Sequence, residues 1–102
     1  MSGVELIAKE REEQIEVHGC SIEYDCANNF EGQLVYAAHV LLEGNDEERL
    51  GYEVPVGWGE VLWDKMLRKN YRDRLVMAGA LIAAELDRRL KILILEKHEK
   101  LS

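Results

Sequence analysis

The chain has 102 residues, and 47% of them are hydrophobic. It contains a single proline and has a formal net charge of −7. This length and composition predict one folded domain over residues 1–102 and argue against disorder. The acidic balance argues against nucleic acid as a partner, because phosphate binding is driven by Lys and Arg. No apolar run is long enough to span a membrane and no signal-peptide pattern opens the chain, so we expect a cytoplasmic protein without a membrane partner.

The first predicted helix has a clear start and end. Ser2 and Glu5 have the spacing of a capping box, and Gly19 is placed to end the helix after His18. Because the helix is followed by a glycine, we expect the chain to leave it at that point.

Three long polar side chains, Glu10, Arg11 and Gln14, fall on the apolar side of this helix. Buried polar groups must be paired, since an orphaned group costs on the order of 1–3 kcal/mol. One interpretation is a network that locks the helix to its neighbours, and the other is the polar lining of a cleft. From this helix alone we favour the network, because long polar side chains can reach out to solvent.

The next segments are predicted as a loop and a second helix. Residues Gly19–Asn29 show no periodicity and are rich in loop-forming residues, and Asp25 is the central carboxylate among them. The second helix is predicted to begin with Asn28 as its cap and Glu31 three residues later. Gln33 lies at the edge of its apolar face.

A long glycine-rich stretch, Glu43–Gly59, is predicted as a functional or mobile loop, with a short helix from about Glu60 to Lys69. Trp58 and Trp63 bracket the end of this loop. Core packing is the first interpretation of both tryptophans, because aromatic side chains dominate small cores. The second is a stacking wall for a base or another flat ligand.

The last predicted helix, Arg72–Leu95, is the longest element. Its apolar seam has steps of three or four residues and runs Leu75, Gly79, Ile82, Leu86, Leu90, Leu93. Glu85 lies at the edge of this face, which makes the helix a candidate for the site as well as the scaffold. The segment Ile92–Leu95 is apolar all round and indicates a subunit interface. The sequence therefore predicts an all-α, compact four-helix bundle with a long C-terminal helix that dimerises.

Two groups of carboxylates in the first half of the chain have a recognisable spacing. EExxE at residues 12–16 and ExxD at residues 43–46 match the metal-binding pattern of all-α nucleotide pyrophosphohydrolases. We interpret this match as accidental, because Glu12 and Glu16 lie on the solvent side of their helix and Gly44 breaks any helix that would present Glu43 with Asp46. A chain with 20 acidic residues gives such matches often.

A second set of motifs covers nearly the whole chain up to Arg88. Its segments are Glu10–Gln14, Gly19–Asp25, Gly32–Ala38 and the specific block Leu75–Arg88. In these segments the chain resembles small phage and prophage proteins related to dATP/dGTP diphosphohydrolases, which are MazG-like. Where those proteins place Trp, His and Glu, this chain has Cys20, Tyr24 and Gln33. The resemblance therefore implies the fold more strongly than the activity.

The resemblance implies a protein that binds a nucleotide or another small phosphorylated ligand, and the apolar segment Ile92–Leu95 predicts a homo-oligomer. In an active form it would be a Mg²⁺-dependent nucleoside triphosphate pyrophosphohydrolase, with Mg²⁺ polarising the α-phosphate and activating a water. The resemblance makes Glu10, Asp25 and Glu85 the catalytic and metal-binding set. The substrate-binding set is Arg11, Gln14, Gln33, Trp58 and Lys65, with Arg11 or Lys65 offsetting phosphate charge and Trp58 stacking on the base.

Three alternatives stay open. Glu85 could pair with Arg88 or Arg89 at helical spacing instead of binding metal. The chain could be a non-catalytic phage protein that sequesters a nucleotide or inhibits a host protein. It could also be a helical subunit of a larger assembly.

Overall fold

The computed structural model describes residues 1–101, with side chains through residue 99, and within that range it contains six helices and no strand. The helices are α1 (Gly3–Glu16), α2 (Ile22–Asn28), α3 (Gln33–Leu41), α4 (Asp46–Leu50), α5 (Glu60–Leu67) and α6 (Tyr71–Leu101). The predicted all-α class and long C-terminal helix are confirmed, whereas the predicted number of four helices is wrong. None of the described helices is both long and apolar enough to cross a membrane.

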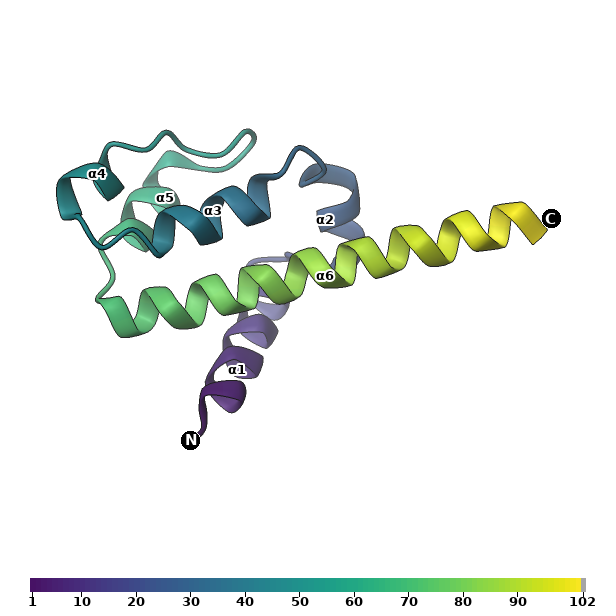
Figure 1. The fold of residues 1–102 in the computed structure, drawn as a ribbon, viewed down its shortest axis with the longest axis horizontal. Coiled ribbons are helices and arrows are strands. Elements are labelled where there is room, and N and C mark those ends of the chain that lie inside the picture. The colour runs from purple at the N-terminus through teal and green to yellow at the C-terminus, as the bar shows by residue number, and fades with distance from the viewer. Residues whose placement is uncertain (102) are drawn as a thin grey trace.

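Helix α6 is the scaffold of the molecule. It has 31 residues, and α1, α2 and α3 each pack directly against it. Figure 1 shows α3, α4 and α5 along the first half of α6, α1 crossing it, and the C-terminal part extending beyond the rest of the chain. The side chain of Asn70 caps its first turn by accepting a hydrogen bond from the backbone N–H of Asp73 at 2.9 Å.

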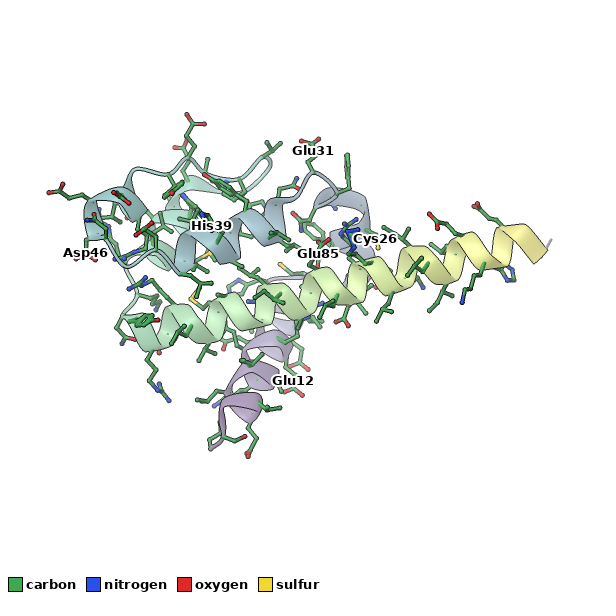
Figure 2. All side chains as sticks on the ribbon, viewed as in Figure 1. Glu12, Cys26, Glu31, His39, Asp46 and Glu85 are labelled. Carbon is green, nitrogen blue, oxygen red and sulfur yellow. The ribbon has the colours of Figure 1, made fainter. Side chains whose placement is uncertain are left out.

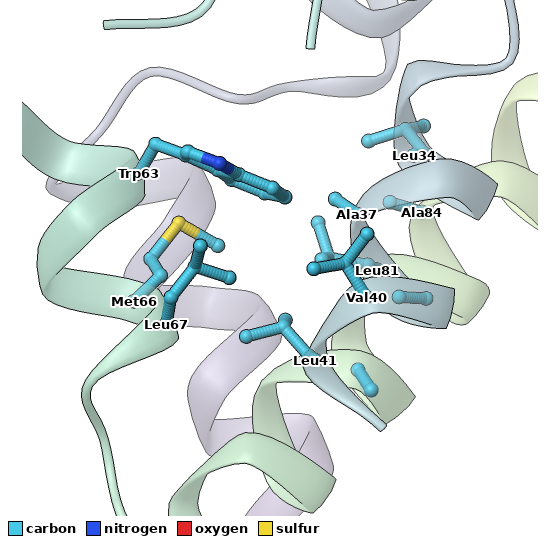
Figure 3. Packing of buried hydrophobic residues seen from close by; sticks show 11 residues of the cluster. Leu34, Ala37, Val40, Leu41, Trp63, Met66, Leu67, Leu81 and Ala84 are labelled. Carbon is cyan, nitrogen blue, oxygen red and sulfur yellow. The ribbon is translucent and has the colours of Figure 1, made fainter. Parts of the chain in front are cut away.

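The core lies where α3, α5 and α6 meet. Large side chains from α5, namely Trp63, Met66 and Leu67, face Val40 and Leu41 of α3 (Figure 3). Small residues at the contact between α3 and α6 let the two backbones approach closely; they are Ala37, Ala38, Ala78 and Ala84. On the other side of α6, a Cβ atom built on Gly79 would lie 2.6 Å from Cδ1 of Ile7. An alanine at this position would require the Ile7 side chain to move, so the glycine allows α1 to pack closely on α6.

Within this chain, α1 covers the apolar seam predicted on α6 at Gly79, whereas the large side chains of the seam stay exposed. These large side chains are between 43% and 58% exposed; they are Leu75, Ile82, Leu86, Leu90 and Leu93. The buried face of α6 instead carries the small residues of the core together with Leu81, Glu85 and Arg88. The alanines of α6 let α3 pack closely against it, and the larger side chains of the seam remain outside this contact.

Two predicted boundaries near the first helix are wrong. Helix α1 has the predicted capping box, with Ser2 accepting from the backbone of Glu5, but it ends at Glu16 instead of His18. Gly19 still makes the sharp turn, with a φ of 69° that favours glycine. The predicted loop that follows contains α2, which begins where the Ser21 side chain accepts a hydrogen bond from the Tyr24 N–H.

The next two boundaries also differ from the prediction. Asn28 ends α2 and does not cap α3, which begins after Gly32 at a φ of 83°. The predicted long loop contains the short helix α4, capped by the side chain of Asn45. Short helices such as α2 and α4 carry too few residues to show a helical period, and their caps are the only local signal.

Candidate functional site

A cavity of about 250 Å³ lies between α1, α2, the start of α5 and the middle of α6. Five of the eight predicted site residues line it: Glu10, Arg11, Gln14, Asp25 and Trp58. Apolar side chains complete its wall, namely Leu34, Leu62, Met66, Met77 and Leu81. The structure thus brings together the polar side of α1 and one of the two tryptophans.

Trp58 is tied to the buried carboxylate through one intermediate side chain. Its indole Nε1–H donates to Oδ1 of Asn29 at 2.9 Å, and Nδ2 of Asn29 donates to Oδ1 of Asp25 at 2.7 Å. Trp58 also packs edge-on against Trp63, with ring centroids 6.1 Å apart. Trp63 is buried in the core, which confirms the packing interpretation for that residue. Trp58 is half-buried: it packs against the edge of the core and also lines the cavity.

Arg11 and Asp25 form the charged part of the cavity wall. Nη2 of Arg11 lies 3.8 Å from Oδ2 of Asp25 and 3.7 Å from Oδ2 of Asp87, while Nη1 donates to the carbonyl oxygen of Cys20 at 3.0 Å. Nε and Nη2 of Arg11 and Oδ2 of Asp25 are buried without a hydrogen-bond partner in the described part of the chain. Burial raises the pKa of Asp25, opposed by its hydrogen bond from Asn29 and by the charge of Arg11. The wall therefore contains hydrogen-bond donors on Arg11 and an acceptor on Asp25 that have no partner among the described residues.

Glu10 and Gln14 lie one helical turn apart on α1. Nε2 of Gln14 donates to Oε1 of Glu10 at 3.5 Å, which is the long limit of a hydrogen bond. Burial raises the pKa of Glu10 above its usual value of 4.5, and repulsion from Glu13 raises it further. Glu10 is thus a carboxylate poised to take up a proton more readily than one in water.

Glu85 does not line the cavity. It accepts two hydrogen bonds from Arg88, from Nε at 3.0 Å and from Nη2 at 2.7 Å, and Nη1 of Arg89 lies 3.8 Å away. Figure 2 shows Glu85 where α2 lies over α6. The alternative interpretation, a pair at helical spacing, is confirmed for this residue. Its two carboxylate oxygens are committed to a bidentate ion pair.

A magnesium site made of Glu10, Asp25 and Glu85 does not fit this arrangement. Across the described residues, no three carboxylate, histidine or cysteine side chains lie together in a group that could hold a metal ion. Asp25 is engaged by Asn29 and faces Arg11, so two of the three carboxylates already have cationic or amide partners. Mg²⁺ requires several oxygen ligands in near-octahedral geometry, and the chain does not present them here.

The two remaining predicted residues lie elsewhere. The amide of Gln33 is used structurally, because Nε2 donates to the carbonyl oxygens of Asn28 at 3.0 Å and Val56 at 3.4 Å. Its Oε1 accepts from the backbone N–H of Glu31 at 2.7 Å. Lys65 lies on α5 and lines a second, wider hollow that adjoins the cavity. Neither residue is part of the cavity wall.

The literal carboxylate pattern is not assembled into a site. Figure 2 places Glu12 on α1 and Asp46 at the far side of the molecule, at the start of α4. Asp46 pairs with Arg49 at 2.7 Å. The structure therefore agrees with the interpretation of this pattern as accidental.

Sequence reasoning missed Asn29, the residue that links Trp58 to Asp25. It was part of a predicted loop, and its only signal was a spacing of four from Asp25, which has meaning once α2 is recognised as a helix.

Comparison with protein-family models, with curated proteins and with solved structures finds no match to this chain. The resemblance to MazG-like proteins therefore rests on the sequence motifs described above.

Proposed function

We propose that this chain is a MazG-like nucleotide-binding protein that takes the base of a nucleoside phosphate into the cavity beside Trp58. The observation that carries this proposal is the meeting of an indole wall with the unpartnered polar atoms of Arg11 and Asp25. A volume of about 250 Å³ is just below the range of about 300–1,000 Å³ for drug-sized ligands, and it suits a base with part of its sugar.

The chemistry of the wall matches that of a base. Stacking of a base on an aromatic side chain contributes about 1–3 kcal/mol and tolerates different bases. The Watson–Crick edge of every base presents hydrogen-bond donors beside acceptors. Arg11 supplies unused donors and Asp25 an unused acceptor on the same wall. Because these atoms are covered by their neighbours, a ligand contacts them only after a small shift of the surrounding side chains.

The proposed role is binding with weak or absent turnover. Pyrophosphate release would need Mg²⁺ held against the phosphates, and the ion pair of Glu85 with Arg88 removes one of the three carboxylates that the resemblance implies. The positive charge of Arg11 beside Asp25 offsets the negative charge of a second carboxylate of that set. These pairings support a protein with an impaired site, and they favour nucleotide sequestration as its activity.

Tryptophan fluorescence tests this proposal directly, because the chain has two tryptophans and only Trp58 lines the cavity. Titration with dGTP and dATP should quench the emission in a saturable manner. Trp58→Phe should abolish most of the quench, whereas Trp63→Phe, the matched control in the core, should retain it. Equal quenching in the two variants, or none in the wild type at millimolar nucleotide, would overturn the proposal.

We also propose that the chain forms a homodimer through the exposed part of the seam of α6. Four of the exposed seam residues follow one another along α6 beyond Gly79, where α1 packs, and monomers rarely expose such a large apolar face; they are Ile82, Leu86, Leu90 and Leu93. Burying the exposed half of these side chains in two copies contributes on the order of 10 kcal/mol. That is comparable with the estimated cost of association, so the dimer requires most of the seam.

A further inference from the structure

A second hollow, of about 410 Å³, lies between α1, α5 and the first turns of α6. Four cationic side chains line it: Lys9, Lys65, Lys69 and Arg72. The whole chain has 13 Lys and Arg residues against 20 acidic ones, so four cations in one hollow are a local reversal of the overall charge. We call this hollow the lysine groove.

The cations of the lysine groove are largely unpaired. Arg72 lies 3.6 Å from Asp73, but Lys9, Lys65 and Lys69 form no ion pair with any residue that the structure describes. All three lysines are exposed. Structural ion pairing therefore does not account for their position, and their ammonium groups are available to an anion from solution.

The lysine groove adjoins the cavity beside Trp58. The residues that line both are Glu10, His18, Leu62, Met66 and Met77. A molecule with its base in the cavity could therefore extend its charged end into the groove without crossing the body of the protein. Glu10 stands at this junction, and because its carboxylate repels phosphate, the phosphates of such a molecule would lie on the lysine side of the groove.

The geometry points to the lysine groove as a binding site for an oligophosphate, a chain of two or more linked phosphates. For a nucleotide this inference rests on the proposed function, because the cavity must take the base while the groove takes the terminal phosphates. Inorganic tripolyphosphate presents the same chemistry without the base. Lysine ammonium groups bind phosphate as point charges, and several of them along one groove match a charge that is spread along a chain.

The acidic residues of the groove favour an extended polyanion over a small anion as its ligand. Glu10, Glu13 and Asp73 also line it, so a small monovalent anion gains little from the four cations beside them. An extended polyanion can contact several ammonium groups at once along the lysine side. We therefore expect tripolyphosphate to bind much more tightly than a single inorganic phosphate.

Calorimetric titration with sodium tripolyphosphate at low ionic strength tests this inference on the full chain. The wild type should bind, and Lys65→Gln with Lys69→Gln should weaken the affinity by about tenfold, as expected from the loss of two ion pairs of ordinary surface strength. Lys91→Gln with Lys97→Gln, on the projecting part of α6, makes the same charge change away from the groove and should leave the affinity unchanged. Thermal melts of the variants check that each is folded.

A parallel titration with deoxyguanosine separates this inference from the proposed function. If tripolyphosphate binds and the nucleoside does not, the groove is an oligophosphate site and the nucleotide proposal fails. If the nucleoside binds and tripolyphosphate does not, the cavity proposal stands and the groove inference is overturned. Equal weakening by the groove pair and the control pair would also overturn it, because it would indicate non-specific attraction.

Discussion

The guanidinium of Arg11 faces the carboxylate of Asp25 across 3.8 Å in the wall of the cavity, with no hydrogen bond between them. Both side chains are buried, at 8% and 0% exposure. A buried charge without its partner is costly, so each residue limits the penalty of burying the other. The two opposite charges stabilise each other, and Nε and Nη2 of Arg11 and Oδ2 of Asp25 remain without a hydrogen-bond partner among the described residues.

We expect Arg11→Met to lower the free energy of unfolding by about 3 kcal/mol, because it leaves the Asp25 carboxylate buried and uncompensated. The double variant Arg11→Met with Asp25→Asn should lose less than the sum of the two single changes. Urea denaturation followed by circular dichroism measures all four proteins. Strict additivity would show that the two groups do not interact.

The raised pKa of Glu10 predicts a specific pH dependence of stability. Because the folded chain binds the proton more tightly than the unfolded chain, the free energy of unfolding falls as the pH rises from 4.5 toward the folded pKa. Glu10→Gln removes this loss. The free energy of unfolding of Glu10→Gln, minus that of the wild type, should therefore increase between pH 4 and pH 7.

The matched control for this experiment is Glu12→Gln, which removes one negative charge from the exposed side of the same helix. Subtracting its effect isolates the part that comes from the burial of Glu10. A relative stability of Glu10→Gln that falls with rising pH would contradict the assigned direction.

We expect Gln33→Glu to destabilise the protein and not to create activity. The change replaces an amide that donates to the carbonyl oxygens of Asn28 and Val56 with a carboxylate that repels them. Loss of these bonds with the side chain still buried should cost about 1–3 kcal/mol. Thermal denaturation and a pyrophosphate-release assay with dGTP measure both effects, and a gain of Mg²⁺-dependent turnover would contradict this placement of Gln33.

The sequence indicates the cavity only as the second interpretation of the polar side of α1, because the network that locks the helix to its neighbours is favoured. The unusual polar side of α1 was visible because Glu10, Arg11 and Gln14 interrupt an apolar face, and all three line the cavity. The helix containing Asp25 was not visible, because seven residues hardly reveal a period. The link through Asn29 depends on that helix and could not be predicted without it.

The role of Glu85 illustrates a different limit. The sequence places this residue at the edge of the apolar seam of α6, but the large side chains of that seam are exposed, whereas Glu85 is 9% exposed. Burial alone does not distinguish a metal ligand from one half of an ion pair, and Arg88 lies at the spacing that permits the pair. Only the side-chain geometry decides between the two. The same holds for Gln33, whose burial is due to its hydrogen bonds to backbone groups.

The homodimer proposal predicts that Ile82→Glu with Leu86→Glu will shift the protein to a monomer in sedimentation velocity at micromolar concentration. The two charges lie in the middle of the exposed seam, where they would be buried by a second copy. Val56→Glu with Val61→Glu, two exposed positions away from α6, is the matched control and should leave the sedimentation unchanged. A wild type that sediments as a monomer would overturn the proposal.

The most direct test of the proposed function is a nuclear magnetic resonance titration of ¹⁵N-labelled protein with dGTP. The side-chain N–H signals of Trp58 and Arg11 report from the cavity wall, and that of Trp63 reports from the core. We predict saturable shifts of the Trp58 and Arg11 signals, with the Trp63 signal moving less. Unchanged Trp58 and Arg11 signals at millimolar dGTP would contradict nucleotide binding in this cavity.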